Sequence, residues 1–79
     1  MRVRNRSTLE LTVPITLSEL FDYPVGSLVT VDHYKREVDE HGFVKSDSPL
    51  IRVVSPDGYR VFHISHEEYK IPETKEGPT

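Results

Sequence analysis

Residues 49–72 read PLIRVVSPDGYRVFHISHEEYKIP and carry the clearest structural pattern of this chain. Two runs rich in β-branched and other apolar residues flank the tetrapeptide Ser55-Pro56-Asp57-Gly58. Proline presets the backbone of the second turn position, and glycine supplies a left-handed residue. The pattern predicts a β-hairpin with a three-residue loop, in which Ser55 opposes Tyr59. A four-residue loop would shift the register by one residue and exchange the partners across the hairpin.

Both faces of this hairpin are partly apolar. In the three-residue register, one face carries Ile51, Val53, Tyr59, Val61 and His63, and the other carries Leu50, Arg52, Val54, Arg60, Phe62 and Ile64. A hairpin with one wet face would alternate more cleanly between apolar and polar residues. We therefore expect both faces to be covered, with Arg52 and Arg60 at the rim of the second face.

The chain after the hairpin predicts a helical turn and a closing strand. Ser65 and Glu68 have the spacing of a helix capping box, which indicates a single α or 3₁₀ turn. Residues 69–71 then predict a short strand that ends at Pro72. Residues 73–79 are charged and have nothing to bury, so we expect a disordered tail.

The first part of the chain predicts a strand and a short helix. Apolar and polar residues alternate over residues 8–15, as in a half-buried strand. Thr16 and Glu19 again have capping-box spacing. This spacing predicts a helix over residues 17–22, which ends before Pro24 because a residue that precedes proline avoids the helical region.

The middle of the chain predicts turns, a long strand and loops. Residues 24–27 have the composition of a turn. Residues 28–38 are strand-like, residues 39–42 form a polar loop, residues 43–44 are an apolar return, and residues 46–48 form a second loop.

This order of elements resembles an SH3-like small barrel over residues 27–72. We therefore expect a mainly β fold, a curled antiparallel sheet of five to six strands with one short N-terminal helix. Residues 8–22 would cover the open face, residues 8–72 would form one domain, and residues 1–7 would be a flexible basic arm. The chain has no tryptophan and no Ala-Leu-Tyr-Asp-Tyr type run, so the resemblance does not imply binding of proline-rich peptides.

The composition excludes several classes of protein. The chain has 79 residues and no cysteine, which excludes disulfides and thiolate zinc sites. Stability must then come from one small core. No apolar run is long enough to cross a membrane, and no apolar segment follows the arginine-rich start as it would in a signal peptide. We expect a cytoplasmic protein without membrane contact.

Catalytic and metal-binding patterns are missing from the sequence. His63, His66 and Glu67 suggest a metal site by composition, but they lack the His-Glu-x-x-His spacing that places two imidazoles on one helix face. No nucleophile motif and no glycine-rich phosphate loop occurs. We expect a protein that is not an enzyme and uses neither a metal nor a cofactor.

Arginines at the start of the chain indicate one candidate site. Arg2, Arg4 and Arg6 alternate and could neutralise phosphates, and Tyr34 and Tyr59 could stack on bases. The rest of the chain holds 7 basic and 13 acidic residues, so it would repel a duplex. Nucleic-acid binding is therefore the alternative function.

Acidic residues around the long strand favour a partner protein. They are Asp32, Glu37, Asp39, Glu40 and Asp47. A small acidic domain could occupy a basic groove on another protein, as virus-encoded inhibitors of host enzymes do. We expect a non-enzymatic adaptor or inhibitor that binds another protein or a second copy of itself, through an exposed strand edge or through residues 34–47. The candidate partner-binding residues are Tyr34, Arg36, Asp39, Glu40, Arg52, Tyr59 and Arg60.

Overall fold

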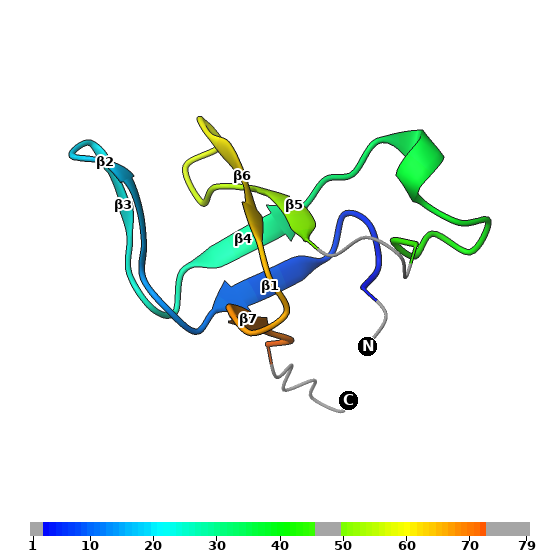
Figure 1. The fold of residues 1–79 in the computed structure, drawn as a ribbon, viewed down its shortest axis with the longest axis horizontal. Helices are drawn as coiled ribbons and strands as arrows, with labels where there is room; N and C mark the ends of the chain where they lie inside the picture. The colour runs from blue at the N-terminus through cyan, green and yellow to red at the C-terminus, as the bar shows by residue number, and fades with distance from the viewer. Residues whose placement is uncertain (1–2, 46–49, 73–79) are drawn as a thin grey trace, which may run out of the picture.

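The computed structural model describes residues 3–45 and 50–72, and its fold is mainly β, as predicted. The elements are β1 (Thr8–Leu11), β2 (Ile15–Ser18), β3 (Phe21–Tyr23), β4 (Leu28–Val31), the 3₁₀ helix η1 (Lys35–Glu37), β5 (Ile51–Val54), β6 (Val61–Ile64) and β7 (Tyr69–Lys70). Five strands form an antiparallel sheet with the order β6-β5-β4-β1-β7, and β2 pairs with β3 in a separate hairpin (Figure 1). Within the described residues β6 and β7 are the two edges, and the sheet does not close into a barrel.

One face of the sheet buries the core. Residues alternate between buried and more exposed along β1, β4, β5 and β6, as the pleat of a strand requires. The buried side chains from the sheet are Leu9, Leu11, Val29, Val31, Ile51, Val53, Phe62, Ile64 and Tyr69. On β6, Val61 is 47% exposed and His63 is also exposed, so the described residues of this chain leave that face of the hairpin uncovered.

The hairpin lies where it was predicted, but its register differs by one residue. Val54 pairs with Val61, and the Ser55 N–H donates to the Arg60 carbonyl at 2.8 Å, which leaves a four-residue loop. The Ser55 hydroxyl explains this choice, because it is buried and needs partners. It donates to the Asp57 carboxylate and accepts the Arg60 N–H at 3.2 Å. Arg60 and Phe62 share one side in either register, and the observed register adds Ile51 and Val53 to that core-facing side.

The helix predicted over residues 17–22 is absent, and β2 and β3 form a hairpin there. The Thr16 hydroxyl donates to Asp22 across the hairpin at 2.8 Å instead of capping a helix. A helix of six residues gains too few hydrogen bonds to offset its nucleation cost. The strand gains a core contact, since the buried ring of Tyr23 stacks on Phe62 with centroids 5.9 Å apart. The hairpin thus covers part of the core face.

The long strand predicted over residues 28–38 is also shorter than expected. β4 ends at Val31, and η1 follows after three residues. The Glu37 carboxylate accepts the Tyr34 N–H at 3.2 Å, and the Glu37 N–H donates to the Tyr34 carbonyl at 2.8 Å. These reciprocal bonds close a tight turn that a continuous strand could not accommodate.

The predicted turns are present. In the turn at residues 24–27, Ser27 N–H donates to Pro24 at 3.1 Å and Gly26 has a φ of 95°. In the loop at residues 39–42, Gly42 N–H donates to the Asp39 carbonyl at 3.1 Å. Residues 65–68 form one hydrogen-bonded turn and not a helix, although the Glu68 carboxylate accepts the Ser65 N–H at 2.8 Å as the capping box predicted.

The N-terminal segment packs on the domain from Val3 onward, within the stretch for which the sequence predicts a flexible basic arm. Val3 is 3% exposed, and the N–H groups of Asn5 and Arg6 donate to the carbonyls of Gly42 and Val31. Arg2, the loop at residues 46–48 with Asp47 in it, and the expected disordered tail at residues 73–79 lie outside the described residues.

Candidate functional site

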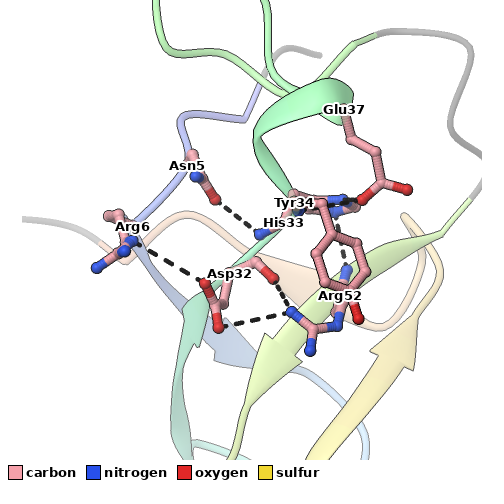
Figure 2. A network of polar contacts seen from close by, with 7 residues as sticks. All are labelled: Asn5, Arg6, Asp32, His33, Tyr34, Glu37 and Arg52. Carbon is pink, nitrogen blue, oxygen red and sulfur yellow. Dashed lines mark hydrogen bonds and ion pairs between the residues drawn. The ribbon is translucent and has the colours of Figure 1, made fainter.

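His33 organises a network of polar contacts beside η1 (Figure 2). Its side chain is buried, and the residue is 7% exposed. Nε2 lies 2.9 Å from the backbone nitrogen of Arg52 and must accept, because a backbone N–H can only donate. The ring proton is therefore on Nδ1, which donates to Glu37 Oε1 at 3.0 Å. The His33 N–H donates to the Asn5 side chain at 2.8 Å, so this residue joins the N-terminal segment, η1 and β5.

Glu37 is fixed by the same network. Its carboxylate accepts from the His33 ring and from the Tyr34 N–H. The hydrogen bond from His33, with a smaller contribution from the Tyr34 N–H, holds the pKa of Glu37 below its ordinary value, although partial burial opposes the shift. Glu37 therefore stays ionised and keeps η1 closed against β5.

Arg52 and Asp32 form the second part of the network. The Arg52 guanidinium donates to the Asp32 carbonyl and lies 3.5 Å from the Asp32 carboxylate. Arg6 approaches the same carboxylate at 4.0 Å (Figure 2). Asp32 thus holds the Arg52 side chain in one orientation.

Tyr34 lies on the surface of this network. It is 54% exposed, and the Arg52 guanidinium lies 4.5 Å from its ring centroid. The Arg36 guanidinium lies 5.6 Å from the same centroid, so both cations are within the range of a cation–π interaction. We call Tyr34, Arg36 and Arg52 the Tyr34 cluster. The structure therefore brings together three of the predicted partner-binding residues.

Asp39 and Glu40 do not join this cluster. Asp39 Oδ1 accepts the N–H groups of His41 and Phe43 at 2.9 and 3.0 Å, which shapes the loop. Glu40 is exposed, and its carboxylate lies 3.5 Å from the His41 ring. The Asp39 carboxylate thus shapes its own loop, and its role in partner binding stays a prediction.

Tyr59 and Arg60 lie on a different surface. Tyr59 is 78% exposed, and the Arg60 guanidinium lies 4.2 Å from the ring centroid of Phe21 on β3. Arg60 is on the core-facing side of the β5–β6 hairpin, whereas Arg52 is on the opposite side. The β2–β3 hairpin and η1 lie at opposite ends of the long axis (Figure 1). The predicted partner-binding set is therefore divided between two places.

The two described arginines of the alternative site, Arg4 and Arg6, contact residues that flank η1. The Arg4 guanidinium lies 4.6 Å from the ring centroid of Phe43 and donates to the His41 carbonyl at 3.4 Å. Arg6 approaches Asp32, as described above. Both side chains thus contact the protein itself.

The histidines named as possible ligands do not converge. His63 is exposed on β6, while His66 Nδ1 lies 2.8 Å from the Tyr69 hydroxyl. Burial raises the pKa of Tyr69, which keeps its hydroxyl protonated. Among residues 3–45 and 50–72, no three His, Asp or Glu side chains are grouped to hold a metal ion. No helix in the same ranges is long and apolar enough to cross a membrane.

Comparison with known proteins gives no family. No protein-family model matches the chain, and the searches of curated proteins and of solved structures found no significant match. The candidate site therefore rests on its geometry.

Sequence reasoning missed the residues that position the cluster. His33 and Asn5 carried no motif, because their partners are 19 and 28 residues away in the chain. The His33–Glu37 pair has a spacing of four residues, but both residues lie within residues 28–38, for which the sequence predicts a strand. On the other surface, Phe21 lies under Arg60 from β3, where the sequence predicts a helix that the structure does not have.

Proposed function

We propose that this protein is a non-enzymatic binding module, an adaptor or inhibitor, and that it binds another protein through the Tyr34 cluster. The observation that carries the proposal is the half-exposed Tyr34 ring beside the Arg36 and Arg52 guanidiniums. Tyrosine and arginine are enriched among the residues that dominate protein–protein binding energies. Asp32 and Glu37 hold this surface in place before binding, which reduces the entropy lost on association.

The proposal includes an SH3-like architecture. β4, β5 and β6 follow one another in the sheet, and β7 returns beside β1 after the tight turn at residues 65–68. This arrangement supports the element order of an SH3-like barrel, with the β2–β3 hairpin inserted between the first two strands of the sheet. Such a scaffold places η1 and its flanking loops at one end, where a partner can reach them.

Nucleic-acid binding is the second candidate function. One observation favours it: Arg4 and Arg6 lie at the same end of the molecule as Tyr34, so cations and an aromatic ring are close together. The contacts of Arg4 with Phe43 and of Arg6 with Asp32 weigh against it, since binding phosphate would disturb them.

Affinity capture with matched variants tests the proposed function. The double variant Tyr34→Ala/Arg36→Glu changes the cluster, and Tyr59→Ala is the control at an exposed position away from it. Circular dichroism checks that both remain folded. We expect the wild type and Tyr59→Ala to retain the same proteins from a lysate and the double variant to lose them. Equal capture by all three, or a strict monomer that captures nothing, would reject the proposal.

A further inference from the structure

We infer that the partner segment bound at the Tyr34 cluster is acidic. This inference rests on the proposed function and reverses the charge that the sequence suggested for the partner. From the acidic residues around η1, the sequence predicts an acidic surface that would fit a basic groove on the partner. The structure shows that most of these carboxylates are already engaged within the protein.

The acidic side chains near η1 have internal partners. Asp32 pairs with Arg52 and lies near Arg6. Glu37 accepts from His33 and Tyr34, and Asp39 accepts two backbone N–H groups of its loop. A partner that took these carboxylates would have to break the contacts that shape the site.

In the part of the chain that the structure describes, the cations at the same end outnumber the carboxylates, and three of them have no ion pair. Among residues 3–45 and 50–72, six cationic side chains lie on the N-terminal segment, η1, the following loop and the start of β5, against four carboxylates there; the cations are Arg4, Arg6, Lys35, Arg36, Lys45 and Arg52. Within the described residues, no ion pair involves Lys35, Arg36 or Lys45.

The charges of the molecule are therefore separated. Away from η1, the described residues carry six carboxylates and only two cations, Arg60 and Lys70. The chain as a whole has a net charge of −3. An acidic segment would be repelled by most of the surface and attracted to the end that bears Tyr34. The separation of charge therefore directs the segment to that end.

The side chains of the cluster suit an acidic peptide. A guanidinium presents paired N–H donors that match a carboxylate, and no described residue pairs with those of Arg36. The exposed Tyr34 ring can pack against an apolar side chain between the carboxylates of the partner. A protein segment is favoured over nucleic acid because Arg4 and Arg6, the side chains expected to bind phosphates, contact Phe43 and Asp32.

Direct binding measurements test this inference. The probes are a fluorescent poly-glutamate peptide with one central leucine, the matching poly-glutamine peptide and an oligothymidylate. We expect saturable binding of the glutamate peptide only, weakened by salt because the cations are exposed. Arg36→Glu should lower its affinity about tenfold or more by reversing one contacting charge. Arg60→Glu should leave the affinity within about twofold, since Arg60 lies on the opposite side of the hairpin.

The remaining outcomes separate a failure of this inference from a failure of the proposed function. Equal binding of both peptides, no effect of Arg36→Glu, or binding of oligothymidylate alone would overturn the inference of an acidic protein segment. If the glutamate peptide fails but the Tyr34 cluster still captures a protein, only this inference fails. If the glutamate peptide binds and the double variant captures the same proteins as the wild type, the proposed function fails instead.

Discussion

Replacing His33 by phenylalanine tests whether this buried ring holds η1 against β5. A phenyl ring fills a similar volume but cannot accept the Arg52 N–H that now donates to Nε2 at 2.9 Å. A buried N–H without a partner costs about 1–3 kcal/mol. For a domain of this size, that loss lowers Tm by roughly 5–20 °C. The lost bond to Glu37 adds to the effect in the same direction.

Urea unfolding measures this change, followed by circular dichroism because the chain has no tryptophan. His63→Phe is the matched control, since His63 is exposed on β6 and pairs with Arg52 in the ladder. The control should change the unfolding free energy by less than about 0.5 kcal/mol. Hydrogen exchange of the Arg52 amide should accelerate in His33→Phe only. Equal urea midpoints for the two variants, or an unchanged Arg52 amide, would refute the role assigned to His33.

Three further predictions concern turns and carboxylates. Gly58→Ala should lower stability by about 1–2 kcal/mol in thermal unfolding through backbone strain alone, because Gly58 has a φ of 80° and a Cβ there would meet no atom within 4 Å; an unchanged Tm would contradict this. Since the folded pKa of Glu37 is lowered, its stabilising effect is present above the ordinary value of 4.5 and is lost as pH falls through the folded pKa. Glu37→Gln should therefore differ most from the wild type near neutral pH and converge with it in acid, and a constant difference in urea midpoint across pH would contradict the assignment. Ser55→Ala should raise the pKa of Asp57, which the Ser55 hydroxyl lowers more than any other group, and an unchanged carboxyl titration by NMR would contradict that cause.

The hairpin shows how far local sequence determines the fold. Proline and glycine at positions 56 and 58 fixed its place, because few other backbones accommodate them. They did not fix the register, since three- and four-residue loops both accept this sequence. The deciding contacts are side-chain bonds of Ser55 with Asp57 and with the Arg60 N–H, which depend on the completed turn.

The segment at residues 17–22 shows the limit of capping signals. Thr16 and Glu19 have the spacing of a helix start, yet Thr16 bonds to Asp22 across a hairpin. The outcome depends on Tyr23, which gains a stacked contact with Phe62 from a distant part of the chain. A long-range contact of this kind leaves no local pattern in the sequence.

The candidate site was predicted in part. Exposed aromatic and arginine residues pointed to Tyr34 and Arg52, and the structure brings their side chains together. The sign of the available charge was not predictable, because carboxylates and cations are mixed along the chain. Only the fold shows that Asp32 and Glu37 are bonded within the protein, while Arg36 has no ion pair among the described residues.

An NMR titration tests the central claim most directly. Adding the poly-glutamate peptide to the ¹⁵N-labelled protein should shift the amide signals of Tyr34, Arg36 and Arg52 in a saturable way. The amide signals of Tyr59 and Arg60 should stay in place, because these residues lie on a different surface. Saturable shifts confined to Tyr59 and Arg60, or no saturable shift at the Tyr34 cluster, would contradict the account.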